Sequence, residues 1–159
     1  MGLIRIAEKK DFEGICNLIK SEKELFLVFP SGSYPLTISQ LEKLSEVRMD
    51  LSVLVEEDKI IGFANFYNYE PNKCLFIGNV IIDKDHRFKG LGKFIVLHML
   101  NTAYEKYNLP EVRISVFNEN TRALLLYTSL GFLPYEVEEK INFQGDKVAQ
   151  INMKKAREH

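Results

Sequence analysis

The chain has 159 residues, of which 46% are hydrophobic and 27% charged, and its formal net charge is −1. These values are normal for one globular domain with a hydrophobic core, so we expect a single domain over residues 1–159. A net charge this close to zero provides no basic field for nucleic acid, and we expect no nucleic-acid partner.

Nothing in the sequence predicts a membrane segment. The longest uncharged run, residues 25–41, contains Pro30 and Pro35, and the start of the chain lacks the layout of a signal peptide. The two cysteines, Cys16 and Cys74, have no metal-ligand spacing. One disulfide is possible, but two reduced thiols are favoured. We therefore expect a cytoplasmic protein with no membrane partner and no metal.

The first half of the chain predicts one strand followed by two helices. Apolar and polar residues alternate over Leu3–Ala7, which is typical of a short strand. A helix capped by Asp11 is expected to run to about Ser21. A loop over Glu24–Pro35 follows, and then a second short helix around Ile38–Leu44.

Three strands separated by turn residues come next, at Leu51–Val55, Ile60–Tyr69 and Cys74–Ile82, and they predict an antiparallel meander. The rest of the chain predicts a long helix at Leu91–Tyr107 and a fifth strand at Val112–Phe117. A further helix follows this strand, and the chain ends in a hairpin of two strands at Leu133–Phe143 and Lys147–Met153.

This order predicts an α+β fold with a central mixed, mostly antiparallel sheet of about seven strands and about four helices. The strands on either side of the long helix should be neighbours and run parallel, because a helical crossover connects them.

The connection between the third meander strand and the long helix has the character of an anion site. An apolar strand ends at Ile82, a short charged segment follows, and Gly90-Leu91-Gly92 opens the helix. At such a place the free N–H groups and the positive end of the helix dipole point at one spot, and glycine lets a phosphate come close.

Spacing excludes two kinds of nucleotide loop. A P-loop lysine is followed by serine or threonine, whereas Lys93 is followed by Phe94. The dinucleotide fingerprint requires a third glycine where Ile95 stands. The remaining pattern is Arg-x-x-Gly-x-Gly over residues 87–92, and it resembles the acyl-CoA pyrophosphate loop of the GNAT N-acetyltransferases.

A second pattern supports this resemblance. The segment 118–132 is similar to the GNAT pattern Asn-x-x-Ala-x-x-Leu-Tyr-x-x-x-Gly-Phe, with matches at Asn120, Ala123, Leu126, Tyr127, Gly131 and Phe132. The expected element order agrees over nearly the whole chain. The sequence therefore resembles a GNAT-superfamily N-acetyltransferase.

The resemblance implies acetyl-CoA as co-substrate and an acetyl transfer to a primary amine by direct attack in a ternary complex. It implies that the strand edge binds the pantetheine arm through Val80, Ile81 and Ile82. The loop is implied to bind the pyrophosphate through Arg87, Phe88, Lys89, Gly90, Leu91, Gly92 and Lys93, and two asparagines, Asn118 and Asn120, are implied to contact the CoA arm.

Tyr127 is implied as the proton donor to the departing thiolate, because a phenol remains protonated at neutral pH. A core tyrosine is the alternative interpretation, and the two asparagines could be simple helix caps. Gly90 and Gly92 could likewise be plain turn glycines.

No general base stands out. Some relatives carry a glutamate on the fourth or fifth strand, whereas Asn79 and Ser115 occupy the equivalent positions here. Glu119 and His86 are secondary candidates. The pattern leans towards an amine of low pKa or a water-relayed base, and it leaves open a catalytically inactive CoA-binding sensor or structural relative. An unrelated α+β binding module is a third hypothesis.

The acceptor is not identified by the sequence. We expect the aromatic residues Phe26, Phe29 and Tyr34 to shape its site, although Phe26 and Phe29 could equally pack under the loop. A homodimer is possible.

Overall fold

The computed structural model describes residues 2–158, and within them seven strands form one sheet in the order β1-β2-β3-β4-β5-β7-β6. The strands are β1 (Leu3–Ile6), β2 (Met49–Glu56), β3 (Lys59–Glu70), β4 (Cys74–Ile82), β5 (Glu111–Phe117), β6 (Leu133–Ile141) and β7 (Lys147–Ala156). Only β4 and β5 are parallel neighbours among them. The predicted mixed, mostly antiparallel sheet and its one helical crossover are confirmed.

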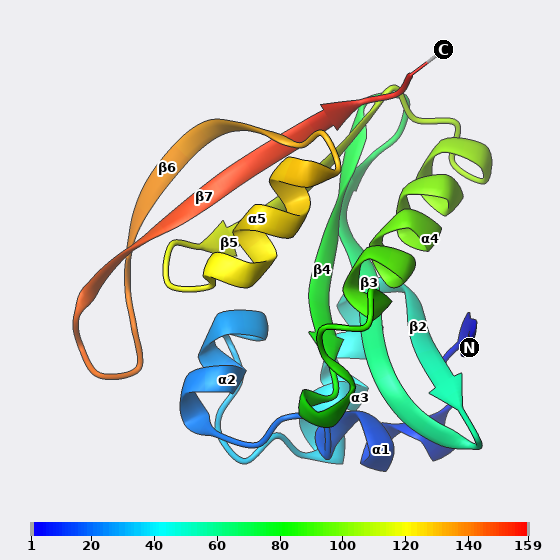
Figure 1. Cartoon of the computed structure of the whole chain (residues 1–159), viewed down its shortest axis with the longest axis vertical. Coiled ribbons are helices and arrows are strands. Elements are labelled where there is room, and N and C mark those ends of the chain that lie inside the picture. Colours follow the sequence, from blue (N-terminus) through cyan, green and yellow to red (C-terminus); the bar gives the residue numbers. More distant parts are fainter. Residues whose placement is uncertain (1, 159) are drawn as a thin grey trace.

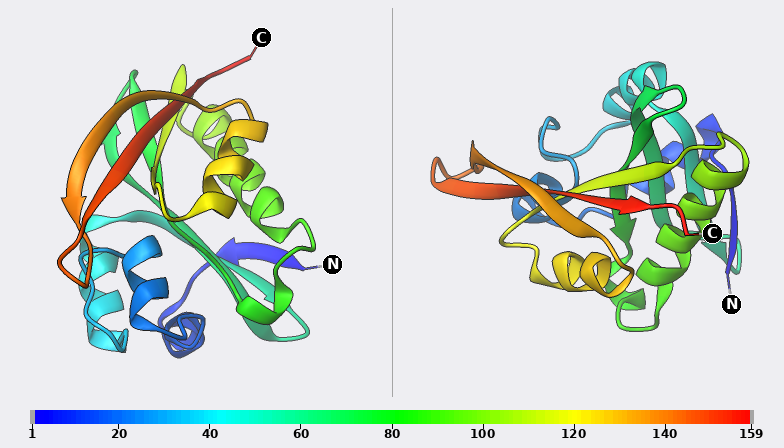
Figure 2. Two further views of the ribbon diagram at one scale, coloured as in Figure 1. Left: turned by 60° about the vertical axis from the view of Figure 1, so that its left-hand side comes forward. Right: turned by 90° about the horizontal axis from the view of Figure 1, so that it is seen from above.

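Five α-helices cover the sheet within the same residues: α1 (Phe12–Cys16), α2 (Glu22–Val28), α3 (Ile38–Val47), α4 (Leu91–Glu105) and α5 (Thr121–Ser129). Two 3₁₀ turns, Lys9–Asp11 and Lys84–His86, precede α1 and α4. Figures 1 and 2 show α1, α2 and α3 grouped together near one end of the sheet, whereas α4 and α5 form a separate group on its other face.

Two hydrophobic clusters correspond to these two helix groups. One contains Leu54 and Phe66 together with residues of α4, and the other contains Val53 and Phe63 together with residues of α1 and α3. Val53 and Leu54 are consecutive in β2 and enter different clusters, because successive side chains of a strand point to opposite faces. The sheet is thus packed on both sides.

The prediction of one helix from Asp11 to about Ser21 is wrong. The helix α1 ends at Cys16, and α2 begins at Glu22 and overlaps the segment Glu24–Pro35 that was predicted to be a loop. Asp11 makes no side-chain cap to α1, because Arg5 holds its carboxylate at 2.7 and 2.9 Å. The carboxylate also accepts a hydrogen bond from the Glu8 N–H.

The helix α2 has its own start signal and its own buried face. Ser21 Oγ accepts a hydrogen bond from Glu24 N–H at 3.1 Å, as an N-cap does. Leu25 and Phe29 are four residues apart and both buried, at the helix and at its C-cap. This short helix contacts β4, next to which the candidate site forms.

The strands β4 and β5 separate after a short parallel pairing. Their register runs from Cys74–Glu111 to Ile77–Ile114 and stops there, while β4 continues to Ile82. On its other side β4 pairs with β3 through a bulge, because Gly78 faces Asn65 while Ile81 faces Phe63. Asn79 lies in this bulge with φ 49°. The bulge bends the strand and leaves the β5-facing edge of its last residues without a strand partner.

The hairpin of β6 and β7 extends from the body of the sheet (Figures 1 and 2). The outer strand β6 exposes Leu133, Val137 and Ile141. In residues 2–158, no helix combines the length and the apolar character needed to cross a membrane.

Candidate active site

The loop after β4 presents the start of α4 to a cavity. Gly90 is the N-cap of α4 with φ 78°, a left-handed conformation that favours glycine. Phe94 N–H donates to Gly90 O, so the first N–H groups of α4 precede the first helical bond. The first turn of α4 contains no acidic residue. The positive end of this helix is therefore available to an anion.

Arg87 fixes the position of the loop. Its Nε donates to Ile82 O at 3.2 Å, and its Nη2 lies 3.0 Å from the Glu24 carboxylate, with both side chains mostly buried. The ion pair joins α2 to the loop across a wide separation in sequence. Arg87 therefore acts on the shape of the loop as well as on its charge.

A cavity of about 250 Å³ lies between this loop, the end of β4 and α5. It brings together most residues predicted to contact acetyl-CoA: Val80, Ile81, Ile82, Arg87, Phe88, Gly90, Leu91, Gly92, Lys93 and Asn120. We call it the loop cavity. Lys89 does not line it, and Asn118 is directed elsewhere, with Oδ1 accepting from Ala149 N–H at 2.9 Å.

The loop cavity also contains residues that sequence reasoning missed, including Glu24, Val28 and Arg122. Arg122 follows the N-cap Asn120 of α5, and its guanidinium lies 5.3 Å from the Phe88 ring. Burial and the neighbouring Arg87 lower the pKa of Arg122. In the sequence, Arg122 is only one arginine inside the second motif, and its position there does not predict that its charge faces the cavity.

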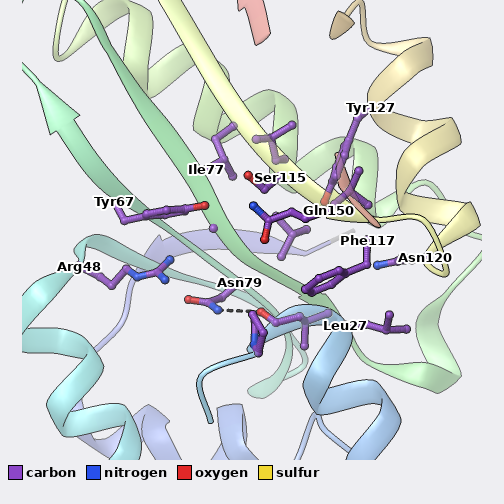
Figure 3. Close-up of a pocket in the computed structure, with 16 residues that line it drawn as sticks. Leu27, Arg48, Tyr67, Ile77, Asn79, Ser115, Phe117, Asn120, Tyr127 and Gln150 are labelled. Atoms are coloured by element: carbon purple, nitrogen blue, oxygen red, sulfur yellow. Dashed lines mark hydrogen bonds between the residues drawn. The ribbon is translucent and has the colours of Figure 1, made fainter. Parts of the chain in front are cut away.

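A second cavity of about 100 Å³ is lined mainly by β4, β5 and the end of α2 with the loop after it (Figure 3). We call it the central cavity. The two cavities share four lining residues, Val28, Val80, Asn120 and Tyr127. The opening between β4 and β5 is thus bordered by two adjacent cavities that share Tyr127.

Tyr127 is almost fully buried at this junction, with 5% of its surface exposed. Its ring packs edge-on against Phe132, with centroids 6.1 Å apart. Burial, together with the nearby Tyr67, raises the pKa of Tyr127 above its usual value. The hydroxyl therefore stays protonated through the physiological range and can donate a hydrogen bond.

The two positions where some relatives carry a catalytic glutamate hold one hydrogen-bonded amide, Asn79, and one hydrogen-bonded hydroxyl, Ser115. Asn79 donates from Nδ2 to Val28 O at 2.7 Å and accepts from Asn65 Nδ2 at 2.8 Å. Ser115 donates to Asn152 Oδ1 at 2.7 Å. Among the described residues, no carboxylate lines the central cavity.

Two acidic groups are linked to this wall, Glu136 through Asn152 and Glu138 through both Asn152 and Gln150, which itself lines the cavity. Asn152 Nδ2 donates to Glu136 and to Glu138, each at 2.7 Å. Of the secondary base candidates, Glu119 is exposed and lines neither cavity, while His86 lines the loop cavity with Nδ1 2.7 Å from Asp83.

The three aromatic residues predicted to shape the acceptor site are in different environments. Phe26 stacks on Phe117 with centroids 4.5 Å apart, and Phe117 lines the central cavity. Phe29 is buried in the cluster under α1 and α3. Tyr34 is exposed, and it lines a separate surface hollow with Phe26 and Phe143. Phe26 therefore reaches the site through its partner, whereas Phe29 packs in the core.

Metal ligands do not cluster in the described chain: no group of three or more histidine, cysteine, aspartate or glutamate side chains is placed to hold an ion in residues 2–158.

Comparison with known proteins agrees with this architecture. A spermine acetyltransferase relative named "Probable spermine N(1)-acetyltransferase", from Bacillus subtilis subsp. natto, is 30% identical over 101 residues, which are 60% of this chain and 64% of that protein. Acetyltransferase PseH from Campylobacter jejuni is 24% identical over 87 residues, 55% of this chain and 53% of that protein. The matches thus span less than two thirds of the length of these relatives.

Solved structures share the fold over nearly the whole chain. The spermidine N-acetyltransferase of Vibrio cholerae, solved with CoA and spermine, has a TM-score of 0.81 at 20% identity and covers 98% of this chain and 95% of its own. The ribosomal-protein-alanine N-acetyltransferase of Brucella melitensis has a TM-score of 0.80 at 16% identity, covering 98% and 99%. The family model described as "Acetyltransferase (GNAT) family" matches residues 13–132, and the chain belongs to this family.

Proposed function

We propose that the protein transfers an acetyl group from acetyl-CoA to a primary amine by direct attack within a ternary complex. The observation that carries this proposal is the meeting of two cavities at Val80 and Tyr127. One cavity has the features of an anion site, and the other is smaller and lined by both polar and apolar side chains. A donor and an acceptor placed in them would meet where β4 and β5 separate.

The residues of the loop cavity fit the CoA moiety. The first N–H groups of α4 and the cations Lys93 and Arg122 offer hydrogen bonds and positive charge to a pyrophosphate. The edge of β4 beyond Ile77 has no strand partner on the β5 side, so its backbone groups can pair with the amides of a pantetheine arm.

Bound acetyl-CoA supplies the thioester whose acetyl group is transferred. The amine nitrogen forms the new C–N bond as the C–S bond breaks, and the products are an N-acetylamine and the CoA thiol. The proton that the nitrogen loses balances the one that the sulfur gains. An N–H of the β4 edge facing the thioester oxygen would stabilise the negative charge that develops there, and one such donor contributes roughly 3–4 kcal/mol.

Tyr127 is proposed to donate to the departing sulfur. Its raised pKa makes it a weak acid, but the same burial raises the basicity of a thiolate formed beside it. Solvent returns the proton to the phenol as the nitrogen releases its own. This assignment needs no covalent enzyme intermediate.

The amine must arrive neutral or lose its proton through water. Asn79 is committed to Val28 O and Asn65, so a water chain from Ser115 and Asn152 towards Glu138 is the remaining route among these groups. At pH 7 deprotonation costs roughly 4.6 kcal/mol for a lysine-like amine and about 1 kcal/mol for the α-amine of a peptide N-terminus. An acceptor of low pKa is therefore favoured.

The proposal includes a cytoplasmic location and a homodimer. Cys16 and Cys74 are free thiols, which supports a reducing compartment. The exposed apolar residues of β6 offer a surface for a second copy. Light scattering of the purified protein tests the dimer.

The test of the proposed function is thiol release from acetyl-CoA with a panel of primary amines, including spermine, spermidine and amino acids, against a blank without amine. Calorimetry with CoA runs alongside. We expect CoA binding and amine-dependent release. Binding without release from any amine would favour the inactive CoA-binding relative, and the absence of CoA binding would refute both.

A further inference from the structure

One cation in the central cavity has no acidic partner. Arg48 follows α3, is partly buried, and lines this cavity. Its guanidinium lies 3.9 Å from the centroid of the Tyr67 ring, and Nη1 donates to Asn65 Oδ1 at 3.1 Å. Among the ion pairs of residues 2–158, none includes Arg48. Figure 3 shows its head directed towards Asn79 and the interior.

The chain makes room for this guanidinium. A Cβ at Gly78 would lie 2.3 Å from Arg48 Nη1 and 2.7 Å from the Tyr67 ring. Because such contacts do not occur, only glycine at this position of β4 allows Arg48 and Tyr67 to lie against the strand. Arg48 is therefore seated beside the strand that forms the reaction site, and not simply folded over the surface.

The amides around Arg48 are oriented by a carbonyl that can only accept. Val28 O accepts from Asn79 Nδ2, so Asn79 turns its oxygen towards Asn65. Asn65 then donates from Nδ2 and presents Oδ1 to Arg48. This accounts for one hydrogen bond to the guanidinium. Its other N–H groups have no side-chain acceptor among the hydrogen bonds of the described residues.

The position suits an anion attached to the acceptor. A buried cation is normally paired, and an arginine fork matches the two oxygens of a carboxylate. Glu136 and Glu138 do not line the cavity and are hydrogen-bonded to Asn152. Gly78, beside Arg48, and Val80, at the junction of the cavities, are two residues apart on either side of the bulge residue Asn79, so their Cα atoms are at most about 7.2 Å apart, the reach of two extended residues.

We propose that Arg48 binds a carboxylate of the acceptor, so that the substrate class is a small amino acid and not a polyamine. The inference rests on the proposed function. The short distance from Arg48 to the junction places the amine close to the carboxylate in the acceptor, as in an α-amino acid. A polyamine would bring a further positive charge against Arg48, where no neighbouring carboxylate offsets it.

The first arm of the test compares acceptors with and without a carboxylate, and kcat/KM is expressed per neutral amine because amidation also lowers the pKa of the α-amine. Thiol release is measured for the proteinogenic amino acids, their carboxamides and spermine. We expect kcat/KM to fall about 10- to 100-fold from the preferred amino acid to its carboxamide, the range for a charge-assisted hydrogen bond. Equal values for acid and amide, or a preference for spermine, would overturn the inference.

The second arm uses Arg48→Met and Arg48→Lys. Arg48→Met should remove most of the difference between acid and amide, while Arg48→Lys should keep part of it. Both should bind CoA as the unmodified protein does, since Arg48 does not line the loop cavity. Loss of the amide activity together with the acid activity, at unchanged CoA binding, would contradict a specific carboxylate contact.

A third arm separates this inference from the proposed function. Binding of N-acetyl amino acids and of their carboxamides to the CoA complex is measured by calorimetry. Weaker binding of the amides, abolished as a difference in Arg48→Met, supports the carboxylate site even if no amine releases thiol. Equal binding of both series refutes it even if transfer occurs.

Discussion

The replacement Tyr127→Phe removes one oxygen atom at the junction of the two cavities. Among the described residues, no hydrogen bond is made by the Tyr127 hydroxyl, and the ring keeps its edge-on contact with Phe132. Since a hydroxyl that has no protein partner adds no intramolecular hydrogen bond to the folded state, the free energy of unfolding should change by less than about 1 kcal/mol. The CoA affinity should also be nearly unchanged.

Catalysis should respond much more strongly than stability. A positioned proton donor contributes about 10²- to 10⁴-fold, or roughly 3–5 kcal/mol of activation free energy. We therefore expect kcat for thiol release to fall by at least about 100-fold in Tyr127→Phe. The measurement is initial-rate kinetics at saturating acetyl-CoA, together with thermal unfolding of both proteins.

The matched control is Tyr104→Phe. Tyr104 lies on α4, lines neither cavity, and makes one long hydrogen bond of 3.5 Å to Lys155 O. Its loss should leave kcat within about twofold, because surface-side hydroxyls contribute little. If Tyr127→Phe were equally active, Tyr127 would be a packing residue and the proton would reach sulfur by another route.

Four further results are expected. In a pH profile of kcat, deprotonation of Tyr127 should cause no fall in rate below about pH 10, because burial raises its pKa above the usual value. A fall in rate as the pH rises just above neutrality would contradict Tyr127 as the proton donor. Arg122→Ala should weaken CoA binding about tenfold, with less effect at high salt, as calorimetry at two ionic strengths will show. Gly90→Ala should cost roughly 1 kcal/mol of stability and weaken CoA binding, since φ is 78° although no atom lies within 4 Å of the added Cβ; unchanged unfolding would exclude conformational strain. Arg5 lowers the pKa of Asp11, so the stability from this pair should be present above the unfolded pKa of about 3.9 and be lost as pH falls through the folded value. Asp11→Asn should reduce this acid-dependent loss in urea unfolding measured from pH 7 down to pH 3.

The sheet could be predicted because its signals are local. Alternation within β4 and β5 and the turn residues between strands give each strand separately, and the spacing of Arg87, Gly90 and Gly92 identified the loop. The helix α2 was missed although Ser21 and Glu24 form a recognisable capping pattern. Because the predicted first helix was extended to about Ser21, this residue was assigned to the end of a helix, whereas it is the N-cap of the next one.

The chemistry inside the site was less accessible to sequence reasoning. Glu24 and Arg87 form an ion pair across 63 positions, and Arg48 meets Asn65 across 17. Such pairs depend on where the strands and helices come together, and neither partner has a distinctive neighbourhood in the sequence. Phe29 shows the converse problem, because an aromatic residue in a segment beside the site can be directed wholly into the core.

The bulge at Asn79 limits how the length of β4 can vary. Without this one residue, Val80 could pair with Ala64, and Ile81 would still face Phe63, so the ladder beyond the site would keep its register. A deletion there would thus produce a more regular strand with the same outward pattern. It would also remove the amide that links Asn65 to Val28 O, and it would straighten β4 alongside β5. The rest of the sheet would therefore tolerate the loss of this residue. The opening between β4 and β5 would not, because it depends on the bulge.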